Sequence, residues 1–167
     1  MRKVLVLLTV PLVALAAAFA ATAAAPERKV APEFALRDQT GKLHELKKLR
    51  GKVVVLDFGR VICLGCQQAL ADLGQLDREF RDKGLVVLSV NLGVPADVVK
   101  RFAAEKKLEF PFLEDPAYEV TRLYGVRSIP HIVLIDRKGR AARAFTGYDA
   151  ETKQALAAEI RKLLAEK

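Results

Sequence analysis

The amino-acid sequence predicts an α/β domain in which a mixed β-sheet lies between layers of helices. Three observations lead to this fold class. Short apolar, β-branched runs alternate with amphipathic segments of helical period. The last part of the chain has the pattern of a strand hairpin followed by a helix. The chain has 167 residues, and the part that remains after a targeting segment at its start fits the usual size of one domain.

The first segment, residues 1–25, has the layout of a secretory signal peptide. Two basic residues precede an apolar stretch, and small residues follow it. Cleavage would leave residues 26–167 as one domain in the periplasm or another extracytoplasmic space. An uncleaved membrane anchor is the alternative, because residues 4–25 are long enough to span a bilayer. Pro11 and the alanine-rich end favour cleavage.

The first strands and their connections are short. Residues 33–36 and 42–45 surround a glycine turn and predict a hairpin. Residues 52–58 and 85–91 are apolar at consecutive positions, so both faces of these strands should be buried. One polar residue, Asp57, interrupts the first of these two runs.

The remaining elements follow from helical spacing and from proline and glycine positions. Helices are predicted at residues 66–83, 95–107, 117–124 and 150–166. Further strands are predicted at residues 110–113, 130–136 and 141–146, the last two forming a hairpin.

The net charge of +8 does not indicate a nucleic-acid partner. Basic residues are scattered, and the runs at 47–50 and 137–140 fall at predicted turns or short helices without interleaved aromatic residues. We therefore interpret them as solvated surface.

The only two cysteines stand together in Cys63-Leu64-Gly65-Cys66. Such a short loop constrains little unfolded chain, so the pair is not an ordinary structural disulfide. It falls between a buried strand and a helix, where backbone N–H groups and the helix dipole stabilise a thiolate. The spacing lets the second sulfur attack a mixed disulfide formed by the first. We predict that Cys63 is the nucleophile and Cys66 the resolving thiol.

A zinc half-site is the main structural alternative for this pair. Zinc needs two more ligands, and the only histidines, His44 and His131, lie far apart in sequence without metal spacing. We expect no metal and no cofactor other than the redox-active disulfide.

Asp57 lies six residues before Cys63 among apolar neighbours. Burial there should raise the pKa of the carboxyl group, which could then accept the Cys66 proton. The alternative is a structural aspartate satisfied by local hydrogen bonds.

Residues 42–66 and 125–147 resemble the thioredoxin superfamily, specifically the exported TlpA-like, redoxin/AhpC-TSA-like thiol-disulfide oxidoreductases. The residues that carry the resemblance are Leu49-Arg50-Gly51-Lys52, Cys63-Leu64-Gly65-Cys66, Ser128-Ile129-Pro130 and Ile132 to Asp136 before Lys138-Gly139. The resemblance implies a thioredoxin-like three-layer sandwich with helices on both faces and an N-terminal β-hairpin.

The resemblance also implies roles for individual residues. Pro130 would be cis and would face the cysteines, while the Ile129 backbone would pair with an incoming peptide. Leu64 and Gly65 would contact the substrate and tune the redox couple.

Three positions depart from the family pattern. Ile62 replaces the usual tryptophan, Gly65 the usual proline, and Ala69 a glutamate that many TlpA-like proteins carry. These departures leave the direction of electron flow open.

The sequence thus predicts a monomeric thiol-disulfide oxidoreductase that acts on protein cysteines outside the cytoplasm, as a reductant recharged by a membrane electron donor. A thiol peroxidase is one alternative, although peroxiredoxins carry a threonine where Arg60 stands. A copper-binding or metallochaperone module using Cys63, Cys66 and His131 is the other.

Overall fold

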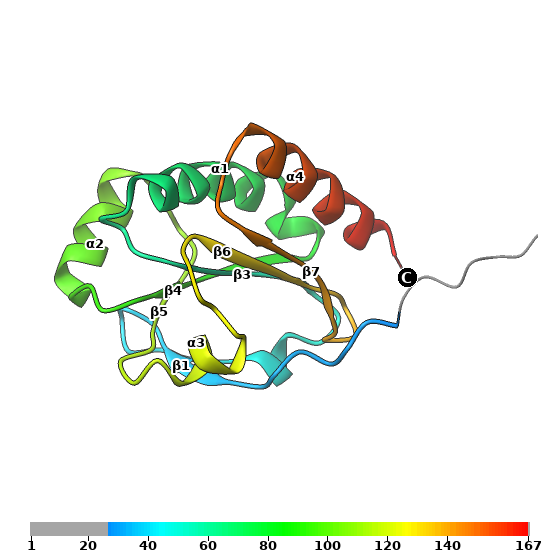
Figure 1. Cartoon of the computed structure of the whole chain (residues 1–167), viewed down its shortest axis with the longest axis horizontal. Coiled ribbons are helices and arrows are strands. Elements are labelled where there is room, and N and C mark those ends of the chain that lie inside the picture. Colours follow the sequence, from blue (N-terminus) through cyan, green and yellow to red (C-terminus); the bar gives the residue numbers. More distant parts are fainter. Residues whose placement is uncertain (1–26, 167) are drawn as a thin grey trace, which may run out of the picture.

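The five-stranded sheet forms the centre of the molecule. A computed structural model describes residues 27–166, so the predicted signal segment lies outside the described residues. The strand order is β5-β4-β3-β6-β7 (Figure 1). The strands are β3 (Val53–Gly59), β4 (Leu85–Asn91), β5 (Phe112–Glu114), β6 (His131–Ile135) and β7 (Ala141–Thr146). β3 pairs in parallel with β4 and antiparallel with β6, so the sheet is mixed, as predicted.

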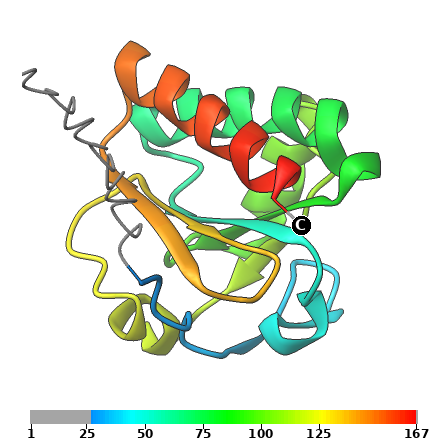
Figure 2. The same cartoon turned by 90° about the vertical axis from the view of Figure 1, so that its right-hand side faces the viewer.

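Helices cover both faces of this sheet. One face packs against α1 (Leu64–Phe80), α2 (Ala96–Glu105) and α4 (Ala150–Ala165). The other face carries α3 (Glu119–Leu123), the 3₁₀ turn η1 (Leu46–Leu49) and the hairpin β1 (Ala35–Arg37) and β2 (Leu43–Glu45). Figures 1 and 2 show the sheet between these two layers. The predicted three-layer arrangement with an N-terminal hairpin is confirmed.

The central strand β3 is buried along its whole length, which confirms burial on both faces. Its alternate side chains therefore enter two hydrophobic clusters, one under α1 and α4 and one above α3. Asp57 is the only charged residue of the strand. The register places it beside Ser89 of β4 and Ile132 of β6.

Helix α1 begins two residues earlier than the spacing predicts. The apolar period starts at Cys66, but Cys63 is the N-cap and Leu64 the first helical residue. The predicted end at Lys83 consists of a separate 3₁₀ turn, η2 (Arg81–Lys83), which stops at Gly84 with a left-handed φ of 99°. None of the helices in residues 27–166 is long and apolar enough to cross a membrane.

Candidate active site

The turn between β3 and α1 presents Cys63 at the start of the helix. The Cys63 N–H donates to the Arg60 carbonyl at 3.0 Å and closes this turn. The Cys63 Sγ in turn accepts a hydrogen bond of 3.4 Å from the Cys66 N–H. The sulfur of Cys63 therefore acts as the helix N-cap, where the partial positive charge of the helix end favours an anion.

The two sulfurs lie in different environments. Both cysteines are free thiols, with Cys63 half-buried and Cys66 fully buried. Burial raises the pKa of the Cys66 thiol to about 12, and the neighbouring Cys63 adds to the effect. Cys66 is thus a protonated thiol at neutral pH and needs a base before it can react as a nucleophile.

Asp57 supplies a carboxylate on the buried side of the cysteine pair. Its side chain is inaccessible to solvent, and the Ser89 hydroxyl donates to its Oδ2 at 2.9 Å. Its Oδ1 has no hydrogen-bond partner among residues 27–166. Burial raises the pKa of Asp57 to about 7, against the opposing effect of the Ser89 hydrogen bond. A carboxyl group with this pKa exchanges protons near neutral pH.

Gly59 keeps Cys66 and Asp57 close together. A methyl group built on Gly59 would lie 3.3 Å from the Cys66 Sγ and 3.7 Å from the Asp57 Oδ2. The sulfur and the carboxylate therefore both face the Cα of this glycine. A side chain at position 59 would occupy the space between them.

The loop before β6 lies next to the Cys63–Cys66 segment. The Ile129–Pro130 peptide bond is cis, as expected. The Pro130 Cδ would lie 3.7 Å from a methyl group built on Gly65, so the proline ring and the Cys63–Cys66 segment are neighbours. Pro130 accepts a hydrogen bond from the Gly147 N–H, whereas no hydrogen bond to another described residue involves the Ile129 backbone.

Comparison with known proteins agrees with this geometry. The model of the AhpC/TSA family matches residues 28–144. The chain belongs to the AhpC/TSA family. A thiol-disulfide oxidoreductase ResA from Geobacillus thermodenitrificans is 35% identical over 117 residues, which cover 70% of this chain and 67% of the relative.

Solved structures lead to the same class. A Chlorobium tepidum protein assigned as the thiol:disulfide interchange protein DsbE is similar with a TM-score of 0.77 and 34% identity, over 83% of this chain and 98% of that one. A Bacteroides thetaiotaomicron protein assigned as a protein disulfide isomerase has a TM-score of 0.76 and 26% identity, over 83% and 89%. The predicted thioredoxin-like fold and the predicted class, thiol-disulfide oxidoreductase, are confirmed.

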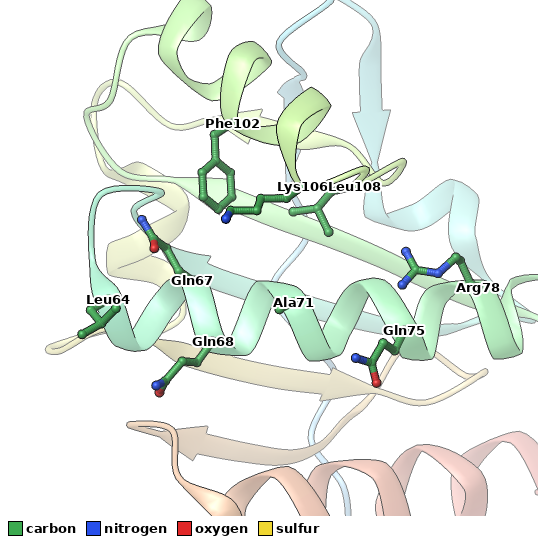
Figure 3. A pocket seen from close by; sticks show the side chains of 9 residues that line it. All are labelled: Leu64, Gln67, Gln68, Ala71, Gln75, Arg78, Phe102, Lys106 and Leu108. Carbon is green, nitrogen blue, oxygen red and sulfur yellow. The ribbon is translucent and has the colours of Figure 1, made fainter.

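In this AhpC/TSA family member, exposed apolar side chains flank Cys63. Ile62 is 67% exposed and Leu64 is 74% exposed. Leu64 also lies at one end of a groove of about 390 Å³ between α1 and α2 (Figure 3). Apolar surface of this kind next to a reactive sulfur is suited to contact with another protein.

The structure does not bring Cys63, Cys66 and His131, the copper ligands considered above, into a common metal site. The His131 Nδ1 lies 2.9 Å from the Thr146 hydroxyl, and burial lowers the pKa of the imidazole. Within residues 27–166, no three histidine, cysteine, aspartate or glutamate side chains are arranged to hold a metal ion. Cys63, Cys66 and His131 therefore do not form a three-ligand site here.

Two residues of the site were missed from the sequence. Ser89 is a polar residue inside a strand predicted to be buried, which is the same signal that marked Asp57. Gly59 gave no such signal, because its importance depends on how closely α1 packs on β3.

Proposed function

We propose that this protein is exported and reduces disulfides in other proteins through Cys63 and Cys66. One observation carries the proposal. The part-exposed sulfur of Cys63 is bonded to the Cys66 N–H, and the buried thiol of Cys66 and the buried carboxylate of Asp57 lie on either side of Gly59. This arrangement suits a nucleophile, a resolving thiol and its base.

In the first step, the Cys63 thiolate attacks one sulfur of the substrate disulfide. A bond between Cys63 and that sulfur forms, the substrate S–S bond breaks, and the released substrate thiolate takes a proton from water. The hydrogen bond from the Cys66 N–H and the start of α1 stabilise the negative charge on Cys63 before attack.

In the second step, Asp57 accepts the proton of the Cys66 thiol, and the Cys66 sulfur attacks Cys63. The Cys63–Cys66 disulfide forms, and the second substrate sulfur leaves as a thiolate that is then protonated. The substrate gains two electrons, which the two cysteines lose, and its two thiolates take two protons from water. The balancing protons reach the solvent when Cys63 ionises before the attack and when Asp57 releases the proton of Cys66. Since Cys63 contributes to the high pKa of Cys66, its conversion to a mixed disulfide makes this proton transfer easier.

The substrate peptide would lie between two surfaces of the site. Leu64 and Gly65 would contact it on the α1 side, and Pro130 would pack against it on the other. The Ile129 backbone supports this placement, because its N–H and C=O remain available for pairing with an extended chain.

The hydrogen bonds around Cys63 favour reduction over oxidation as the biological direction. Strong oxidants of this superfamily owe their potential to a stabilised reduced form. Only one hydrogen bond, of 3.4 Å, reaches the Cys63 sulfur within residues 27–166, and Cys66 is buried as a neutral thiol. We expect a reduction potential closer to roughly −270 mV, as in thioredoxin, than to roughly −120 mV, as in DsbA.

The location follows from the predicted signal segment, residues 1–25. Outside the cytoplasm, no pool of soluble reductant regenerates a dithiol. We therefore propose that a membrane dithiol protein supplies the electrons. We also propose that the protein acts as a monomer.

Trapping experiments test the two cysteine roles. Cys63→Ser should abolish reduction of a model protein disulfide, whereas Cys66→Ser should react once and stop as a mixed disulfide visible by mass spectrometry. If both variants reduced the substrate as fast as the parent, the proposal would be wrong.

A reaction with peroxide distinguishes the proposed reductase from a thiol peroxidase, the alternative enzyme. With Arg60 at the threonine position of peroxiredoxins, we expect the reduced protein to react with hydrogen peroxide only slowly, without a burst of Cys63 oxidation in single-turnover experiments. A fast burst would instead support a thiol peroxidase.

A further inference from the structure

A pocket of about 260 Å³ with a mixed apolar and basic lining lies beside the loop that precedes Pro130. Its lining combines Ile129, whose backbone makes no hydrogen bond to another described residue, with Arg60 from the turn that holds Cys63. The remaining lining residues are Leu92, Tyr118, Thr121, Val126, Arg127 and Ser128. Two of these eight residues are arginines, and none is acidic.

The Arg60 side chain is held in place at this pocket. Its Nε donates to the Leu92 carbonyl at 2.7 Å. A methyl group built on Gly93 would lie 3.4 Å from an Arg60 Nη atom and 2.7 Å from the Tyr118 hydroxyl. The guanidinium group of Arg60 and the phenol of Tyr118 therefore both lie next to Gly93.

Several donors of the pocket have no partner among the other described residues. Among residues 27–166, no ion pair or side-chain hydrogen bond involves Arg127 or Ser128, and the Arg60 Nη atoms and the Tyr118 hydroxyl also make none. The buried carboxylate of Asp115 is bonded to the lining residue Thr121: it accepts from the Thr121 N–H at 2.9 Å and from the Thr121 hydroxyl at 2.7 Å. The positive charge of the pocket is thus left for a ligand.

We infer that this pocket binds an acidic side chain of the substrate protein, close in sequence to the reacting cysteine. Arginine donors suit a carboxylate because they form charge-assisted, often bidentate hydrogen bonds. A peptide that pairs with Ile129 passes directly beside the pocket, so a glutamate within two or three residues of its cysteine would reach Arg60 and Arg127. This inference rests on the proposed function.

Matched peptides test the inference. The probes are amidated peptide disulfides that carry either Glu or Gln two residues from the cysteine. Such a matched pair is made for the position before the cysteine and another for the position after it. Each peptide is mixed with the reduced full-length protein in single-turnover experiments. The second-order rate constant should be about fivefold to tenfold higher for a Glu peptide at low salt. This preference should shrink at about 1 M salt.

Arginine variants locate the effect. Arg127→Gln and the double variant Arg60→Gln, Arg127→Gln should bring the Glu to Gln ratio toward one, whereas Arg127→Lys should keep part of it. Lys106→Gln is the control, because it removes the same charge from the groove between α1 and α2 (Figure 3). It should leave the ratio unchanged.

Three results would overturn the inference: a parent ratio of one, a ratio that survives the double variant, or an equal loss in Lys106→Gln. Reduction of the Gln peptide serves as the separate check on the proposed function. If the Gln peptide reacts through Cys63 but no Glu preference exists, only the carboxylate pocket is wrong. If neither peptide is reduced, the proposed function itself fails.

Discussion

At Asp57, burial and hydrogen bonding act on one carboxylate in opposite directions. Burial dominates and raises its pKa to about 7, while the Ser89 hydroxyl favours the ionised form. The same burial raises the pKa of Cys66 to about 12. Burial in the apolar interior therefore shifts the pKa of both groups that we propose for the second step, Cys66 as the acid and Asp57 as the base.

Asp57→Asn should slow the resolving step without affecting the first attack. The amide cannot accept the Cys66 proton, and loss of a positioned base costs about 10² in rate or more. Stopped-flow mixing with a peptide disulfide, followed by acid quenching, should show the mixed disulfide at Cys63 accumulating. Equal lifetimes of the mixed disulfide in variant and parent would contradict the role of Asp57.

Ser89→Ala should move the pH dependence of resolution upward. Without the donor to Oδ2, the ionised carboxylate is less stable, so the pKa of Asp57 rises further. We expect the midpoint of the rate–pH profile to increase by about one pH unit and the rate at pH 7 to fall. An unchanged midpoint would mean that another group limits the resolving step.

At the scale of elements, strand β3 and helix α1 meet at Gly59. The close approach of the Cys66 side chain to this glycine fixes how α1 lies on the sheet. The burial of β3 could be predicted from its apolar run. The contact with α1 could not, because it depends on the path of the turn Arg60–Cys63, which has no periodic signal.

Gly59→Ala should destabilise the protein and disturb the site. Its methyl group would press on the Cys66 side chain at 3.3 Å, and overpacking of this kind costs about 1–3 kcal/mol. Urea denaturation should show the loss in the free energy of unfolding. Gly65→Ala is the matched control: its nearest neighbour would be the Pro130 Cδ at 3.7 Å, an ordinary contact. A similar loss in both variants would indicate a general effect of alanine rather than the β3–α1 contact.

For the whole molecule, the sequence predicted the layers of the fold and the redox role of the cysteine pair. It did not predict which side chains of neighbouring strands form hydrogen bonds with each other. Ser89 and Asp57 are 32 residues apart, and only the parallel register of β3 and β4 places them side by side. The cis bond before Pro130 was expected from the family resemblance alone. The pocket near Arg60 escaped prediction because four separate segments build it: the turn after β3, the residue after β4, the start of α3 and the loop before β6.

The acidic groups of the molecule form two sets with opposite effects of pH on stability. Burial alone would raise the pKa of Asp38, but hydrogen bonds from Thr40 and His44 outweigh it and hold the pKa at about 2. Such a group stabilises the fold above its unfolded pKa of about 4, and the stabilisation is lost as the pH falls toward 2. Asp57 has the opposite sign, since its folded pKa lies above its unfolded pKa.

Between pH 4 and pH 7, folded Asp57 keeps a proton that the unfolded chain has released. The free energy of unfolding must therefore fall as the pH rises through this window, by about 4 kcal/mol in total for this residue. Above pH 8 the carboxylate is ionised in both states, and its contribution no longer changes. The free energy of unfolding of the reduced parent and of Asp57→Asn is measured by urea denaturation at a series of pH values. The difference between the two proteins isolates the contribution of Asp57, because both proteins contain the groups with lowered pKa, such as Asp38. The variant should be the more stable protein above pH 7, and its advantage should grow from pH 4 upward; a difference that stays constant with pH would show that Asp57 is not buried as a neutral acid.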